Sequence, residues 1–235
     1  MQSLRPVSIQ RHFTKTTPGS VLYRCGDTVV LCTASLENRV PDWMVGRGKG
    51  WITAEYNMLP GSTSPRKSRE RSGKVDGRTT EIQRLIGRSF RAVADLTKLG
   101  ERSLTIDCDV LQADGGTRTA AITGGFIALV DAVNTVFQDA APEAYPLRAS
   151  VAAISVGIVD GAPTLDLDYA RDVKADVDMN VVMTGGGRFI ELQGTGEEAT
   201  FDDAELASLI QLAKQGIQEL TKIQKETLGL GWKFS

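Results

Sequence analysis

The order of apolar and polar residues divides the chain into strands and helices. Alternation with a period of two, bounded by glycine-rich turns, predicts strands in both halves of the chain. Gly26-Asp27 and Asp160-Gly161 are dipeptides typical of tight hairpin turns, and Gly185–Gly187 separates another pair of strands. The predicted strand segments are 21–25, 28–35, 50–59, 103–112, 149–159, 163–170, 177–184 and 188–196.

Three further segments have the spacing of helices. Residues 80–97 place apolar side chains at helical intervals. Thr80 with Gln83 fits a capping box, so the helix is predicted to start near Glu81. Residues 117–137 are mostly apolar, which indicates a buried helix, and residues 202–229 are amphipathic. Strands that precede each helix predict an α+β or mixed α/β fold, with mixed sheets packed against helices.

Length and composition narrow the class of protein. The chain has 235 residues and no Pro- or Ser-rich linker, so a single domain over residues 1–235 is expected. Its three cysteines lack metal-site spacing and fit buried thiols in a cytoplasmic protein. A single histidine argues against zinc sites that need two and against ordinary Ser-His-Asp enzymes. With no run of about 18 apolar residues, no membrane span is expected.

Charge is unevenly distributed, although the net charge is only −2. Nine basic and three acidic residues lie between Arg66 and Arg91, whereas eleven acidic and three basic residues lie between Asp166 and Glu205. The first region would attract phosphates and the second could hold a divalent cation, but two solvated faces would give the same pattern. Residues 61–78 have no hydrophobic period and are interpreted as a long, mobile, basic loop.

The stretch "LQADGGTRTAA", residues 111–121, places two glycines, a hydroxyl and a guanidinium where a helix begins. Helix N-terminal amides lack internal partners and attract anions, and glycines allow an anion to approach them closely. Gly116, Thr117 and Arg118 therefore predict a phosphate cradle, to which Arg78 could add a second guanidinium. The alternative is a glycine turn followed by a surface arginine.

Acidic residues in the second half suggest a cation site. In an extended strand, Asp178 and Asn180 share one face, and Asp172 precedes Asp178 by six residues. One or two carboxylates with water molecules are typical ligands of Mg²⁺. The spacing alone is equally compatible with surface acids beside a turn.

These residues lie in motifs that resemble the bacterial ribonuclease PH family over almost the whole chain. The matching stretches are "LRPV", "GSVLYRCGDTVVLCTAS", "GWITAEYNMLP", "GRTTEIQRLIGRSFRA", "IDCDVLQADGGTRTAAITG", "VAAISVGIVDG", "DVDMNVVMT" and "IELQGTGE". The resemblance implies a single domain of the type shared with domain 2 of ribosomal protein S5. Only three residues precede Leu4, whereas the family usually has an Arg-x-Asp-Gly-Arg segment there.

The resemblance also implies an activity and an assembly. Orthophosphate would attack the last phosphodiester at the 3′ end of a tRNA precursor or other RNA, reversibly releasing a nucleoside diphosphate. The chain would be a cytoplasmic tRNA nucleotidyltransferase that forms a homohexameric ring, a trimer of dimers. The implied site comprises phosphate-binding Arg78, Gly116, Thr117 and Arg118, Mg²⁺-binding or acid-catalytic Asp172 and Asp178, and RNA-contacting Arg66, Arg69 and Arg71.

Two rival functions use the same features. A non-catalytic RNA-binding ring subunit would be expected to lack either the arginines or the acids, and this chain has both. A small-molecule phosphotransferase could use the same cradle, but the basic loop favours a longer polyanion. No Gly-x-x-x-x-Gly-Lys-Ser/Thr loop is present, which argues against a P-loop nucleotidase.

Overall fold

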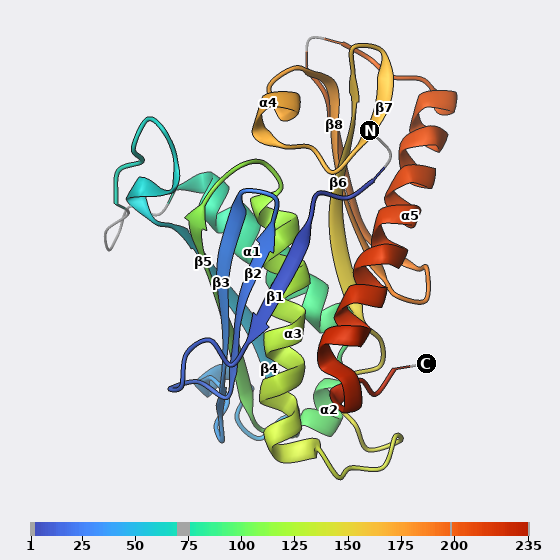
Figure 1. Cartoon of the computed structure of the whole chain (residues 1–235). Coiled ribbons are helices and arrows are strands. Elements are labelled where there is room, and N and C mark those ends of the chain that lie inside the picture. Colours follow the sequence, from blue (N-terminus) through green and yellow to red (C-terminus); the bar gives the residue numbers. More distant parts are fainter. Residues whose placement is uncertain (1–2, 70–75, 198, 235) are drawn as a thin grey trace.

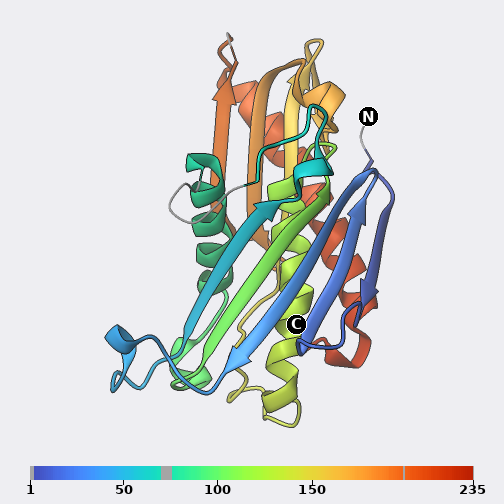
Figure 2. The same cartoon turned by 90° about the vertical axis from the view of Figure 1, so that its left-hand side faces the viewer.

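Two sheets and the helices around them make up the protein (Figures 1 and 2). The structure is a computed structural model that describes residues 3–69, 76–197 and 199–234. The first sheet has the strand order β1-β2-β3-β5-β4, with only the β4–β5 pair parallel. Its strands are β1 Val7–Arg11, β2 Gly19–Cys25, β3 Thr28–Glu37, β4 Trp51–Met58 and β5 Ser103–Gln112.

The second sheet is fully antiparallel, in the order β7-β6-β8-β9. Its strands are β6 Val151–Val159, β7 Ala162–Leu165, β8 Ala175–Thr184 and β9 Phe189–Gly196. The helices are α1 Gly77–Ala92, α2 Leu96–Leu99, α3 Thr117–Phe137, α4 Tyr169–Asp172 and α5 Asp203–Leu228, with short 3₁₀ turns η1 Asp42–Met44, η2 Pro60–Ser62 and η3 Gly229–Gly231. The predicted mixed sheets packed with helices are therefore confirmed.

Helix α3 lies between the two sheets and contacts both (Figure 1). Its apolar sequence fits that position, because the helix is buried on almost every side from Thr117 to Val133. Gly124 allows a close approach to β2, since an added Cβ would lie 2.8 Å from the Tyr23 Cβ. The helix is long and apolar enough to cross a membrane, but 78% of the relevant window is buried inside the protein. It is a core helix of this fold.

Alternation along β8 separates the two faces of the second sheet. Val177, Met179 and Val181 pack in the apolar core between this sheet and α5. Val182 packs in the other core, with α3 and the first sheet. Asp178 and Asn180 alternate with the α5-facing residues, as the sequence predicted, and so lie on the side of the sheet that faces α3.

The predicted start of α1 is wrong. The helix begins at Gly77, where the Asp76 carboxylate caps it by accepting from the Arg78 amide at 3.2 Å. Thr80 instead donates to the Asp76 carbonyl at 3.1 Å, and Gln83 donates to the Tyr56 carbonyl at 3.3 Å. The capping box therefore does not form.

The boundaries around α1 change as a consequence. The predicted loop 61–78 includes the last two residues of η2 and the first two residues of α1, so Arg78 is a helical residue. At its other end α1 stops at Ala92, and residues 96–99 form the separate helix α2, so the predicted continuous helix to residue 97 is also wrong.

Candidate active site

The start of α3 presents unsatisfied amides to solvent. Gly115 and Gly116 both have positive φ, 70° and 63°, and Gly116 is the N-cap residue. No side chain caps this helix end, so the first amides of α3 remain available to an anion. Thr117 is buried and accepts from the Tyr56 hydroxyl at 2.9 Å, which leaves its own hydroxyl proton for a ligand.

Arg118 is held from its outer side by residues of two other elements. Its Nη1 donates to Gln193 Oε1 on β9 at 2.6 Å and lies 3.4 Å from Glu81 Oε1 on α1. Gln193 also donates to Glu81 at 3.5 Å. Both contacts of Arg118 use Nη1, and among the described residues no other N–H group of this guanidinium bonds to a side chain, so these groups remain available to a ligand.

Arg78 lies in the first turn of α1, at the positive end of that helix dipole. Within the described residues, its guanidinium makes no ion pair or hydrogen bond to another side chain. It lines the same small cavity as Arg118. Two helix N-termini and two guanidinium groups therefore meet at one place.

Asp172 ends α4 and Asp178 lies on β8. Burial, and after it the charge of Asp172, raise the pKa of Asp178 to about 6 against the opposing effect of Arg118 and Arg78. Burial also raises the pKa of Asp172, against the opposing effect of the same two arginines. Glu197, directly after β9, adds a third negative charge, which raises the pKa of Asp172 and that of Asp178.

These side chains enclose a polar cavity of about 50 Å³. It brings together all six residues predicted for phosphate binding and acid or metal chemistry. The lining residues are Arg78, Gly116, Thr117, Arg118, Ser155, Asp172, Asp178 and Asn180. Positive and negative groups face each other across it, so it is suited to hold an anion beside a cation or a proton donor.

The donor set also fits Mg²⁺. Asp172, Asp178 and Asn180 offer two carboxylates and an amide oxygen, which are ligands that this ion takes together with water. The pKa of Asp178 is raised first by burial and then by the negative charge of Asp172, and a cation between the two carboxylates would relieve that second effect. Among the described residues, no group of three or more His, Cys, Asp or Glu side chains could hold a metal ion, so an ion on these two carboxylates and the amide would retain water ligands.

A larger cavity of about 690 Å³ opens beside the first. The two share Arg78, Gly116, Thr117 and Asp172. The larger one is lined in addition by Met58, Thr63, Ser64, Pro65, Ala113, Asp114, Gly115 and Tyr169. Its volume is in the range of small-molecule sites, and its added residues are mostly apolar or neutral.

Two of the three predicted RNA-contacting arginines are among the described residues. Arg66 and Arg69 are exposed, and they follow the lining residues Thr63, Ser64 and Pro65 along the chain. Arg71 lies outside the described residues.

Several site residues other than Asn180 carried no sequence signal of their own. Ser155, Asn180 and Gln193 are in register on three adjacent strands, β6, β8 and β9, and form a polar row facing α3. Correct strand pairing would have revealed this row, but no local motif marks Ser155 or Gln193. Tyr56 and Glu81 reach the site from β4 and α1, and nothing in their neighbouring sequence predicts it.

Comparisons with known proteins match the chain over most of its length. Residues 3–134 match the model of the 3′ exoribonuclease family, domain 1, and residues 149–216 match that of domain 2. The chain is 68% identical over 232 residues to ribonuclease PH of Rhodopirellula baltica, covering 96% of this chain and 94% of that protein.

Solved structures share the fold at much lower identity. Rice (Oryza sativa) Rrp46 superposes with a TM-score of 0.77 at 20% identity, covering 97% of this chain and 96% of that one. A chain of the Archaeoglobus fulgidus exosome with RNA bound to the active site has a TM-score of 0.77 at 18% identity, covering 94% and 89%.

Proposed function

The chain belongs to the 3′ exoribonuclease family, and from this premise we propose how its two cavities carry out phosphorolysis. It is a phosphate-dependent nucleotidyltransferase that trims the 3′ ends of tRNA. In this reaction an oxygen of orthophosphate bonds to the phosphorus of the last phosphodiester. The bond from that phosphorus to the 3′-oxygen of the preceding nucleotide breaks, and that oxygen takes a proton. The products are a nucleoside diphosphate and an RNA shorter by one nucleotide.

In our proposal, orthophosphate occupies the small cavity. The observation that carries this assignment is the gathering of Arg78, Arg118 and the uncapped start of α3 around about 50 Å³. The two guanidiniums and the amides offset the repulsion between the attacking phosphate and the scissile phosphodiester. Because phosphate itself is the nucleophile, the protein has only to position it and to neutralise charge.

The two carboxylates, Asp172 and Asp178, act on the scissile phosphodiester and on its leaving group, the 3′-oxygen. Asp172 and Asp178 would hold Mg²⁺, which supplies charge neutralisation at the scissile phosphodiester when it is bound. As an alternative to a metal ligand, Asp178 is a candidate acid, because burial and the charge of Asp172 raise its pKa to about 6. A proton held there would be the one that the departing 3′-oxygen takes up.

The larger cavity receives the terminal nucleotide. It adjoins the small cavity through four shared residues, so a nucleotide there has its phosphate beside Arg78 and Arg118. Tyr169 and Met58 offer side chains against which any base can pack, which suits trimming that does not depend on sequence. Arg66, Arg69 and Arg71 contact the RNA backbone beyond this point.

The remaining parts of the proposal concern assembly and location. The chain acts in the cytoplasm as a homohexameric ring, a trimer of dimers, on tRNA precursors and other RNA 3′ ends. Chains of two exosome structures share the fold, and the proposed ring itself follows from the resemblance of the sequence to the ribonuclease PH family.

One experiment tests the function directly. The protein is mixed with Mg²⁺ and a tRNA that carries extra 3′ nucleotides, with and without phosphate, and the released nucleotides are identified. We expect diphosphates only when phosphate is present. Monophosphates released without phosphate, or no release at all, would refute the proposal, and the second result would favour a non-catalytic RNA-binding subunit.

A further inference from the structure

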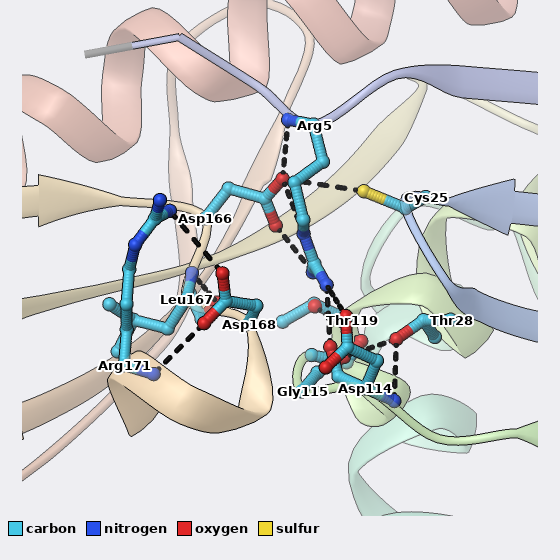
Figure 3. A network of polar contacts seen from close by, with 12 residues as sticks. Arg5, Cys25, Thr28, Asp114, Gly115, Thr119, Asp166, Leu167, Asp168 and Arg171 are labelled. Atoms are coloured by element: carbon cyan, nitrogen blue, oxygen red, sulfur yellow. Dashed lines mark hydrogen bonds and ion pairs between the residues drawn. The ribbon is translucent and has the colours of Figure 1, made fainter. Parts of the chain in front are cut away.

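A buried ion pair stands directly behind the glycine loop that opens α3 (Figure 3). Arg5 Nη2 lies 2.8 Å from Asp166 Oδ1, Arg5 Nε lies 3.1 Å from Asp166 Oδ2, and the Arg5 amide donates to the same oxygen at 2.8 Å. The side chains are only 10% and 3% exposed. The Cys25 thiol adds a fourth contact to Asp166, at 3.3 Å. Neither Arg5 nor Asp166 is among the residues that line the two cavities.

Arg5 contacts the glycine loop at two points. Its Nη1 donates to the Asp114 carbonyl at 2.5 Å, and the same nitrogen is 3.6 Å from the Asp114 carboxylate. A Cβ added to Gly116 would lie 3.2 Å from Arg5 Nη2. The guanidinium therefore packs against the backbone that presents the first amides of α3.

Asp166 ties the same arginine to the segment that leads into α4. Its own amide donates to the Ser155 carbonyl at 2.8 Å, and the next amide, of Leu167, donates to Ser155 Oγ at 3.1 Å. The two segments touch, because a Cβ on Gly115 would lie 2.4 Å from the Leu167 carbonyl oxygen. The ion pair thus joins the anion-binding loop to the element that carries Asp172.

We propose that Arg5 and Asp166 form a positioning pair, which sets the amides of α3 and Arg118 at the correct separation from Asp172. The inference rests on the proposed placement of phosphate in the small cavity. Loss of the pair would shift the donors relative to one another without removing any of them. Phosphate binding would then weaken, while the exposed Arg66 and Arg69, proposed to contact RNA, would be unaffected.

The chain offers a matched control in a second ion pair. Arg11, at the other end of β1, bonds Asp131 through Nη2 at 2.6 Å and Nε at 3.1 Å, and the Asp131 side chain is also 3% exposed. Neither residue lines the small or the large cavity described above. Breaking this pair should disturb stability in a similar way without moving the phosphate site.

The test compares Asp166→Asn and Arg5→Lys with Asp131→Asn and Arg11→Lys in steady-state phosphorolysis. Phosphate is varied at saturating RNA, RNA is varied at saturating phosphate, and a melting curve is recorded for each variant. We expect the phosphate KM to rise roughly tenfold or more in Asp166→Asn and Arg5→Lys, with an almost unchanged RNA KM. Both control variants should keep the parent phosphate KM. Arg5→Lys retains the positive charge, so it provides the test of the pair if Asp166→Asn does not fold.

Two results would overturn the inference: an equal rise of the phosphate KM in all four variants, or a loss of melting temperature alone in Arg5→Lys and Asp166→Asn. Arg118→Ala in the same assay separates this failure from failure of the proposed function. If Arg118→Ala also leaves the phosphate KM unchanged, phosphate does not bind in the small cavity. If Arg118→Ala raises it and the Arg5 and Asp166 variants do not, only the positioning role is wrong.

Discussion

Arg118 and Gln193 meet across the candidate site, with Nη1 of the arginine 2.6 Å from the amide oxygen of the glutamine. Arg118 belongs to the helix between the sheets, and Gln193 lies on β9, in register with Asn180. The hydrogen bond fixes one edge of the guanidinium and directs the rest toward the cavity. The anion site is therefore completed only when the second sheet has packed against α3.

Arg118→Ala should lower kcat/KM for phosphate by roughly 100-fold, because a preorganised donor to the phosphate is lost. RNA affinity should change little, since the exposed arginines of the basic loop remain. Phosphate-dependent release of diphosphates and RNA binding by filter retention measure the two quantities. Arg84→Ala, at an exposed position of α1, is the control. Near-normal dependence on phosphate in Arg118→Ala would contradict the assignment.

Local sequence predicted the parts of this site that a single segment can build. The glycine pair before Thr117 marks the start of α3, because a non-glycine residue seldom adopts the positive φ found there. The alternation in β8 likewise places Asp178 and Asn180 on one face. Both conclusions depend on neighbours within a few residues, which the sequence shows directly.

The remaining parts of the site and of the fold depend on contacts between segments that are distant in the sequence. Asp76 caps α1 although Thr80 and Gln83 form a better motif, because tertiary contacts engage Gln83 with the Tyr56 carbonyl. Arg5 reaches Asp166 across 161 positions of the chain. No periodicity or spacing encodes such a pair, so the support behind the anion loop could not be predicted.

Asp178→Asn should abolish turnover that depends on Mg²⁺ or on a proton held at this carboxylate. Asn keeps the shape of the side chain but loses the charge and the acid. Phosphorolysis measured over a range of Mg²⁺ concentrations tests the expectation. Asp176→Asn, an exposed change two residues earlier on β8, should behave like the parent. Parent-like activity in Asp178→Asn would remove this carboxylate from the mechanism.

The same substitution should stabilise the fold at alkaline pH. Burial and Asp172 raise the pKa of Asp178 from 3.8 to about 6, so between these values the native chain keeps a proton that the unfolded chain releases. Stability therefore falls as pH rises through this interval, and the loss persists above it. Asp178→Asn removes the loss, which we place at roughly 1–2 kcal/mol after allowing for solvent screening.

Urea unfolding in EDTA measures this difference. Asp178→Asn should be more stable than the parent at about pH 8 and equal to it near pH 4, where the parent carboxyl is protonated in the native state. Asp176→Asn again provides the control. A gain that is the same at both pH values would indicate that the proton on Asp178 is not its cause.

Arg66→Ala combined with Arg69→Ala should weaken the binding of long RNA without raising the phosphate KM. Each lost phosphate contact should make the slope of log K against log salt concentration shallower by about 0.7, so in the double variant the slope should be shallower by about 1.4. Binding of a labelled RNA at several salt concentrations measures the slope. Arg47→Ala with Lys49→Ala removes two exposed charges on another loop and should leave it unchanged. A raised phosphate KM with unaltered RNA affinity would reverse the assignment of the loop.

The packing of α3 leads us to propose that residues 1–235 unfold as a single cooperative unit. One apolar core includes residues of both sheets, among them Ile106 from the first and Ala153 and Val182 from the second. Neither sheet can therefore lose α3 without exposing the same core to water. The fluorescence of the three tryptophans, Trp43, Trp51 and Trp232, and far-UV circular dichroism should give coincident urea midpoints at a fixed protein concentration.

Gly124→Val tests this coupling at the helix itself. The added side chain would meet Tyr23 at 2.8 Å and Cys32 at 3.2 Å, so we expect a loss of about 1–3 kcal/mol that shifts both signals together. Gly61→Ala, where an added Cβ meets nothing within 4 Å, is the control. If the two signals separate, with only one of them shifted by Gly124→Val, then the sheets unfold independently and the helix belongs energetically to one of them.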